Sequence, residues 1–255
     1  MNTGHNNRFE DFFADDLYAN FKNLLYNYLL RKRAIKTCMR GVQEGLVLEV
    51  GSGMSPMVVG SDRVVYSELS FRAVQRLKRL EGRGGFVVAD AAHLPFAGSS
   101  FSLVVCSEVL EHLPDDRPAL KEMAEVLKTG GSLVLTFPHR HGYFARDDRF
   151  VGHFRRYELQ EMEGRLKEVG MNPVDIRRVL GPLEKATMVV VVWAVSGLQR
   201  LKGKRGDQEK TIAARQIVTF FFEWFNRLYC VPVWLDARLF PRSLAAVLLV
   251  RAIKE

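Results

Sequence analysis

Short apolar runs recur from residue 46 onward, and a longer polar stretch of helical character separates each run from the next. Runs this short and continuous are typical of strands covered on both faces, and their alternation with helical stretches is typical of βαβ units. The pattern predicts an α/β domain with a doubly wound, mostly parallel sheet. Five of the predicted strands precede residue 140: Leu46–Val50, Val64–Ser67, Phe86–Ala89, Leu103–Cys106 and Leu133–Phe137.

Two later strands complete the predicted sheet. The segment Glu158–Val169 predicts a helix that ends at Gly170, where a left-handed cap is expected, and a sixth strand follows at Val174–Leu180. A seventh strand is expected at Leu244–Ile253, after a segment whose composition differs from the rest of the chain. We therefore divide the chain into an N-terminal helical segment (1–45), the α/β domain (46–182 and 241–255) and a helical insertion (183–240).

The N-terminal segment carries an apolar stripe with helical spacing. Large side chains recur there every four residues, at Phe9, Phe13, Leu17, Phe21 and Leu25. This spacing predicts one or two amphipathic helices, and we expect their aromatic side chains to pack in a core.

The insertion is apolar, basic and aromatic in turn. An apolar run at 186–198 and an aromatic stretch at 217–234 flank the basic loop 199–210. The apolar run falls short of the roughly 20 residues that cross a bilayer, so we expect no transmembrane span. Two interpretations stay open: a pair of helices that docks at an anionic membrane surface, with Arg200, Lys202, Lys204 and Arg205 facing the headgroups, or a helical cap folded onto the domain.

The overall composition narrows the class of partner only slightly. A net charge of +8 favours an anionic partner, although a solvated basic surface explains it equally well. The three cysteines lack C-x-x-C spacing, so neither a disulfide framework nor a zinc site is indicated. The first residues have no secretory pattern, and we expect a cytoplasmic protein, with peripheral contact at the inner face of a membrane as the alternative.

A glycine-rich bend, EVGSGMSP, follows the first predicted strand. Gly51 and Gly53 permit a tight turn and a close approach of backbone to a ligand. A dinucleotide fingerprint requires a third glycine where this chain has Pro56, and Glu49 would repel a phosphate at the rim of such a site. The acid suits a ligand that carries a cationic ammonium group.

These residues resemble the first motif of the class I S-adenosylmethionine-dependent methyltransferases, E/D-x-G-x-G-x-G, with Ser55 at the last glycine. Later segments resemble the family's other motifs, which occur in the family's order across residues 45–170. The motif D-x-x-x-L-P-F at 90–96 is similar to one found in quinone-biosynthesis methyltransferases. The resemblance implies a Rossmann-like seven-stranded sheet with the last strand antiparallel, and S-adenosylmethionine as the cofactor.

The resemblance also assigns cofactor contacts. Glu68 would accept hydrogen bonds from the ribose hydroxyls, Asp90 would contact the adenine amino group, and the end of the fourth strand would lie beside the methionine part. The implied cofactor-binding residues are Glu49, Gly51, Ser52, Gly53, Glu68, Asp90, Ala91, Ser107 and Glu108.

Histidines supply the candidates for proton transfer. His112, His139, His141 and His153 are expected on the cofactor side of the sheet, where a neutral imidazole can accept a proton from the methyl acceptor. We predict His112, His153 and Tyr157 as the catalytic residues.

The sequence motif E-x-x-E-H at residues 108–112 is a candidate metal-binding site. If a helix begins at Glu108, then Glu108, Glu111 and His112 share one of its faces. Some quinone O-methyltransferases that this stretch resembles hold a divalent cation with such a trio, whereas many relatives carry similar text without a metal, and a helix N-terminus favours acids through its dipole alone. We predict no metal, with this trio as the alternative.

Three functions remain to be compared. The first is methyl transfer by in-line displacement to a small or lipid-linked acceptor; Arg155 and Arg156 on a lid would suit an acidic acceptor, or else pair with nearby acids. The second is a non-catalytic protein of the same fold that binds a membrane or partner through 183–240. An RNA methyltransferase is disfavoured, because the chain has no RNA-binding module and no N-P-P-Y after the fourth strand; we expect no nucleic-acid partner.

Overall fold

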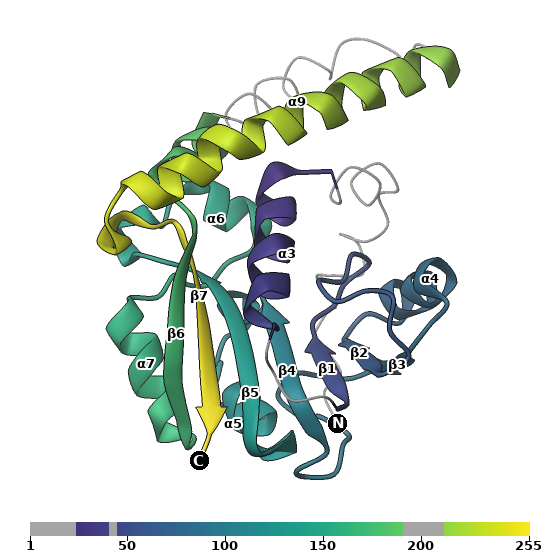
Figure 1. The fold of residues 1–255 in the computed structure, drawn as a ribbon, viewed down its shortest axis with the longest axis vertical. Helices are drawn as coiled ribbons and strands as arrows, with labels where there is room; N and C mark the ends of the chain where they lie inside the picture. Colours follow the sequence, from purple (N-terminus) through teal and green to yellow (C-terminus); the bar gives the residue numbers. More distant parts are fainter. Residues whose placement is uncertain (1–23, 41–44, 191–211) are drawn as a thin grey trace.

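A computed structural model describes residues 24–40, 45–190 and 212–255, with the backbone alone for 212–222. Within these ranges seven strands form one sheet in the order β3-β2-β1-β4-β5-β7-β6 (Figure 1). The strands β1 to β5 pair in parallel, whereas β7 runs antiparallel to both of its neighbours. The predicted fold class is confirmed. The strands are β1 Val47–Val50, β2 Val64–Glu68, β3 Gly85–Val88, β4 Phe101–Ser107, β5 Leu127–Pro138, β6 Met171–Leu180 and β7 Val247–Lys254.

Helices cover both faces of the sheet. The long α9 lies across one end of the sheet and extends beyond it (Figure 1). Residues 182–190 are also helical. The named helices are α3 Tyr26–Cys38, α4 Phe71–Glu81, α5 Arg117–Val126, α6 Arg146–Val151, α7 Leu159–Glu168 and α9 Ile212–Leu239, with short 3₁₀ turns at η1 Leu110–His112, η2 His141–Tyr143 and η3 Arg242–Leu244.

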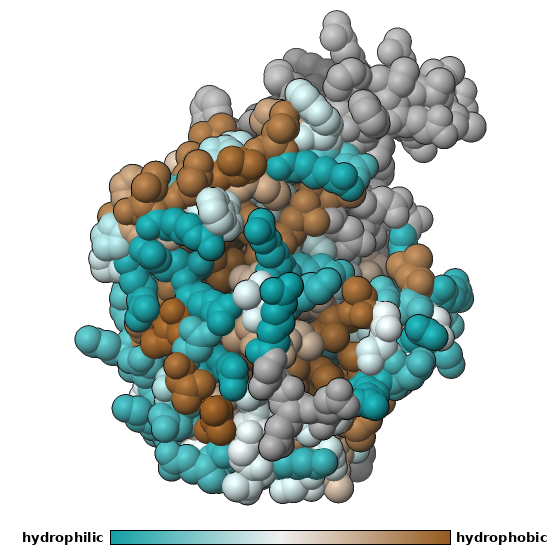
Figure 2. Space-filling view, viewed as in Figure 1, coloured by the Kyte–Doolittle hydropathy of each residue, from teal (hydrophilic) through white to brown (hydrophobic). Residues whose placement is uncertain are grey.

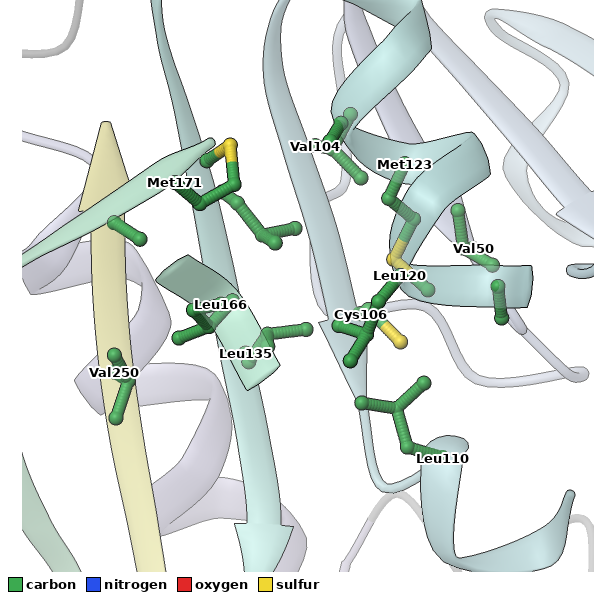
Figure 3. Close-up of a cluster of buried hydrophobic side chains, with 14 of the residues drawn as sticks. Val50, Val104, Cys106, Leu110, Leu120, Met123, Leu135, Leu166, Met171 and Val250 are labelled. Carbon is green, nitrogen blue, oxygen red and sulfur yellow. The ribbon is translucent and has the colours of Figure 1, made fainter. Parts of the chain in front are cut away.

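The alternation of side chains along β4 explains how one strand contributes to two cores. Val104 and Cys106 point to the face that α5 and α7 cover, where they join Leu120 of α5 (Figure 3). Leu103 and Val105 point to the opposite face and join the cluster formed with α3 and α9. Because both faces are apolar, β4 reads as a continuous apolar run in the sequence.

From Glu223 to Leu239, the helix α9 is buried on one side and exposed on the other. Its inner side packs on α3 and β6, with Val233 fully buried, and the side-chain oxygen of Asn226 accepts a hydrogen bond from the backbone amide of Tyr26 at 3.3 Å. Its outer side forms an exposed apolar stripe, which follows the helix in Figure 2. We call these residues the α9 stripe: Trp224, Phe225, Leu228, Val231, Leu235 and Leu239. No helix in the described part of the chain is long and apolar enough to span a bilayer.

The structure differs from the sequence-based expectation after β4. The helix on which the metal alternative depended does not begin at Glu108: this residue has a left-handed φ of +56°, and the 3₁₀ turn η1 follows. The predicted helix that ends near Gly170 is present as α7, and Gly170 has the expected positive φ of +71°. Leu25 lies just before α3, whereas Phe9, Phe13, Leu17 and Phe21 lie outside the described residues, as does the basic loop 199–210.

Candidate functional site

The glycine-rich bend is a tight loop at the carboxyl end of β1. Gly51 and Gly53 have φ angles of +68° and +56°, which L-residues with a side chain rarely adopt. The amides of Gly51 and Ser52 both donate to the carbonyl of Ser67, at 2.8 and 3.2 Å. A Cβ at Gly51 would lie 2.4 Å from the Cγ2 of Val109. The loop is therefore pressed between β2 and the segment after β4, with no space for a larger residue at Gly51.

Glu49, in β1, fixes this loop through hydrogen bonds to its backbone. Its side chain is buried, and its two oxygens accept hydrogen bonds from the amides of Met57 at 2.7 Å and Val58 at 2.9 Å. Burial raises the pKa of Glu49 to about 7, while the two amide bonds oppose that rise. The carboxylate that we expected beside a cationic ligand thus organises residues 51–58 around the site.

Glu68, at the end of β2, faces the same loop. Its oxygens accept hydrogen bonds from the amide of Gly53 at 3.0 Å and from the amide of Ser70 at 3.1 Å. Each carboxylate oxygen has a second lone pair, so Glu68 keeps the capacity to accept two further hydrogen bonds. Asp90, at the next strand end, is exposed and accepts one hydrogen bond, from the amide of Ala92 at 2.9 Å, and Ala91 beside it is half-buried.

The end of β4 brings the loop and the N-terminal helix together. The hydroxyl of Ser107 lies 2.8 Å from that of Thr136. A carboxylate oxygen of Glu108 lies 3.6 Å from the guanidinium of Arg31, which α3 supplies, and the other is buried and accepts no hydrogen bond from the described residues. The predicted cofactor residues therefore line one edge of the sheet, at the ends of β1 to β4.

A second group of side chains lies just beyond Glu108. Ligand-type atoms of Glu111, His112 and His153 all lie within 4.8 Å of one another. Glu111 is fully buried, and neither of its carboxylate oxygens accepts a hydrogen bond from another described residue. Burial raises the pKa of Glu111 well above its usual range, and the neighbouring charge of Glu108 adds to this effect.

His153 is held in place by a buried ionic network. Its Nδ1 lies 2.9 Å from Asp148, which also accepts hydrogen bonds from Arg156 at 2.7 Å and Lys185 at 2.8 Å. Burial would raise the pKa of Asp148, but the bond from His153 and the charge of Arg156 outweigh it and hold the pKa below its usual range. Because an ionised carboxylate only accepts hydrogen bonds, Nδ1 of His153 is the nitrogen that donates to Asp148.

Known proteins resemble this chain in the segment that contains the site. The sequence model of a family described as a methyltransferase domain matches residues 48–135, from β1 into β5. The chain contains a class I S-adenosylmethionine-dependent methyltransferase domain. The matched segment of this methyltransferase domain includes the loop after β1 and the strand ends that carry Glu68, Asp90 and Glu108.

Relatives of the methyltransferase domain agree with this assignment. A demethylmenaquinone methyltransferase from Paenarthrobacter aurescens is 36% identical over 100 residues, which cover 38% of this chain and 40% of that protein. A solved putative methyltransferase from Bacillus halodurans has a TM-score of 0.55 at 16% identity, covering 86% of this chain and 97% of that one. The phosphoethanolamine N-methyltransferase 2 of Haemonchus contortus, solved with S-adenosyl-L-methionine, has a TM-score of 0.53 at 16% identity, covering 88% of this chain and 52% of that one. The chain spans less than half the length of the curated relatives that it matches.

The histidines of the methyltransferase domain separate into two groups. His112 and His153 lie together, with ring centroids 4.7 Å apart. His139 is buried, with Nδ1 2.9 Å from the carbonyl of Ala245, and burial lowers its pKa. His141 is exposed, and its Nε2 lies 3.0 Å from Glu161. Of the four candidates, only His112 and His153 form a cluster.

Tyr157 lies in the core, a position that favours a structural role over the predicted catalytic one. Its side chain is fully buried in the core beside Phe137, and its hydroxyl donates to the buried carboxylate of Asp116. Burial and this hydrogen bond raise its pKa. The phenol is therefore used to hold Asp116 in place.

The two arginines that precede Tyr157 are also engaged within the domain. Arg155 donates to the carbonyls of Leu113 and Pro114, and Arg156 is buried in its ion pair with Asp148. Of the two alternatives for these cations, the structure shows pairing with nearby acids: Arg156 with Asp148, and Arg155 with Asp116 at 3.9 Å. Asp148 and Lys185 were not predicted from the sequence. Their only signal there is the acidic pair DD at 147–148, which resembles an ordinary first turn of a helix.

Proposed function

We propose that this protein transfers a methyl group from S-adenosylmethionine to a small or lipid-linked acceptor by in-line displacement. The observation that carries the proposal is the arrangement of Glu68 and the loop at Gly51–Gly53, with Asp90 and Glu108 at neighbouring strand ends. A carboxylate with spare lone pairs suits the two hydroxyls of a ribose, and a buried carboxylate oxygen at Glu108 suits an ammonium group.

The cofactor supplies an electrophilic methyl group on a sulfonium. The protein contributes the positions of the two reactants, because alignment in a site from which water is excluded removes much of the barrier. Glu49 fixes the loop, Glu68 and Asp90 orient the nucleoside end, and Ser107 and Glu108 lie beside the methionine end in this proposal. Alternative partners such as a pyrophosphate are disfavoured by the same acids.

His112 and His153 are the proposed catalytic residues on the acceptor side. The Nε2 of His153 lies 3.8 Å from a carboxylate oxygen of Glu111, and Nδ1 is engaged by Asp148. With Nδ1 protonated, Nε2 has the lone pair that an acceptor hydroxyl or amine needs when its proton leaves.

We further propose that the α9 stripe docks the protein at an anionic membrane surface. Six large apolar side chains on one face of a helix exceed what a solvated helix usually shows, and Arg227 on the same helix is 71% exposed. The adjoining loop 199–210 is basic in sequence. Docking there would deliver a lipid-linked acceptor, whereas a non-catalytic membrane-binding protein would use the same stripe without methyl transfer.

Calorimetry with S-adenosylmethionine and S-adenosylhomocysteine tests the cofactor site. We expect micromolar binding and a loss of about 10-fold or more for Glu68→Ala, since two charge-assisted hydrogen bonds disappear. Asp62→Ala, at an exposed acid just before the start of β2 and away from the site, should cause no change. Wild-type protein that binds neither compound would refute the methyltransferase proposal.

Flotation with vesicles tests the docking surface. Leu228→Glu should abolish flotation with anionic vesicles, while Leu80→Glu, at a leucine on α4 that is more exposed, should leave it unchanged. Flotation combined with no methylation of lipid extracts by labelled S-adenosylmethionine would support the non-catalytic alternative.

A further inference from the structure

We propose that Glu111, His112 and His153 bind one divalent transition-metal cation. The three side chains come from two segments that lie about forty residues apart, yet their candidate ligand atoms are all within 4.8 Å. Around a tetrahedral ion with bonds of about 2 Å, ligand atoms lie roughly 3.3 Å apart, so side-chain rotations alone bring these three into contact with one ion.

The state of Glu111 points to a missing ligand. The residue is fully buried, and neither carboxylate oxygen receives a hydrogen bond from another described residue. Buried carboxylates in folded proteins are almost always paired, hydrogen-bonded or bound to a metal. The cationic side chains nearby are already committed: Arg31 faces Glu108, while Arg156 and Lys185 pair with Asp148. A cation at Glu111 would therefore give this carboxylate the direct partner that these side chains give to Glu108 and Asp148.

The position of His153 is independent support. Asp148 accepts a hydrogen bond from Nδ1, which directs Nε2 toward Glu111, 3.8 Å away. A carboxylate behind a histidine in this way is the usual second layer of a metal site, since it fixes the tautomer and makes the other nitrogen a better ligand. Asp148 is itself anchored by Arg156 and Lys185, so the histidine is held ready before a cation arrives.

The donor set selects the kind of cation. Two imidazole nitrogens and one carboxylate favour zinc, iron, cobalt or nickel over Mg²⁺, which prefers oxygen ligands. This set is not the E-x-x-E-H trio, because Glu108 lies outside the cluster and turns toward Arg31. Three protein ligands leave a coordination position open, where an acceptor oxygen can be polarised and its pKa lowered. When the cation is bound, Nε2 of His153 is its ligand, and the role as a free base proposed above applies to the protein without the cation.

Metal binding is measured directly, on the full chain without an affinity tag and after treatment with a chelator. Titration with Co²⁺, followed by calorimetry and by the visible absorption of the bound ion, should give one site per chain. Glu111→Gln and His112→Asn should each weaken binding about 10-fold or more, and Asp148→Asn by about 10- to 100-fold through His153. The matched control His141→Gln removes an exposed histidine outside the cluster and should bind Co²⁺ as the wild type does.

Each outcome decides the proposal without reference to methyl transfer. Absence of stoichiometric Co²⁺ and Zn²⁺ binding by the folded wild-type protein overturns it, as does equal binding by Glu111→Gln, His112→Asn and the control. A preference for Mg²⁺ over Co²⁺ also overturns the proposed donor set. Circular dichroism of each variant excludes unfolding as the cause of lost binding. Binding of S-adenosylmethionine with no metal site would leave the proposed function standing and remove only this inference.

Discussion

Replacement of Glu49 by glutamine tests how the loop after β1 is held. Glu49 is buried, and its carboxylate accepts the amides of Met57 and Val58. A glutamine side chain offers one carbonyl oxygen, so one backbone amide would face the NH₂ group instead. We expect Glu49→Gln to destabilise the fold by about 1–3 kcal/mol at low pH, the range for a buried donor left without an acceptor.

The size of this loss should depend on pH. Burial raises the pKa of Glu49 to about 7 in the folded chain, from an ordinary value of 4.5. A raised carboxyl pKa means that the folded state binds the extra proton, so the stabilisation is complete below the ordinary value and is lost as the pH rises through 7. At about 1.4 kcal/mol per pH unit, the wild-type free energy of unfolding should fall by about 2–3 kcal/mol between pH 5 and pH 8 from this group alone.

Urea unfolding followed by circular dichroism from pH 5 to pH 8 provides the measurement. The difference in unfolding free energy between the wild type and Glu49→Gln should shrink as the pH rises, because glutamine does not titrate. The control Glu168→Gln changes an acid that is 62% exposed and should track the wild type at every pH. A wild-type-minus-Glu49→Gln difference that stays constant across this range would refute the assigned pKa and with it the account of the loop.

Three further substitutions test separate parts of the structure. Gly51→Ala should destabilise the fold by at least about 2 kcal/mol in chemical unfolding, since its φ is +68° and the new Cβ meets Val109. Adding Val109→Ala should restore only the part of this loss that comes from the steric clash. The control Gly142→Ala, where nothing lies within 4 Å, should be neutral. Asp148→Asn should lower stability by about 3–5 kcal/mol near pH 7, because the buried cations Arg156 and Lys185 lose their partner. The pKa of Asp148 is depressed, so the wild type loses this stabilisation as the pH falls, and thermal melts of the two proteins should converge in acid. Tyr157→Phe should lose about 1–2 kcal/mol of stability in the same melts and leave S-adenosylmethionine affinity unchanged; a selective loss of methyl transfer with normal stability would contradict its structural role.

The sheet was predictable because its signal is local. A strand buried on both faces, such as β4, must be a continuous apolar run, and glycines at positive φ, such as Gly51 and Gly170, mark where such elements end. The 3₁₀ turn at η1 was not predictable from spacing, because spacing of three and four residues presumes an α-helix. The left-handed backbone at Glu108 breaks that presumption.

The candidate site was predictable only in part, for a related reason. The residues at strand ends follow from topology, since the carboxyl ends of parallel strands meet at one edge. The pairing of Glu111 with His153, and the use of Arg156 and Lys185 to hold Asp148, join segments that approach each other only after the chain has folded. Nor does the sequence reveal that both carboxylate oxygens of Glu49 accept hydrogen bonds from backbone amides.

The position of β7 has a consequence for how the chain is made. This strand is inserted between β5 and β6, although it comes after α9 in the sequence. While residues 247–254 are still inside the ribosome, the long β5 has an unpaired edge, and β6 lacks the one described strand with which it pairs. Such edges invite pairing with other chains. Synthesis of α9 therefore prolongs the interval in which these strand edges are unpaired, and slowing translation across residues 212–239 should increase aggregation.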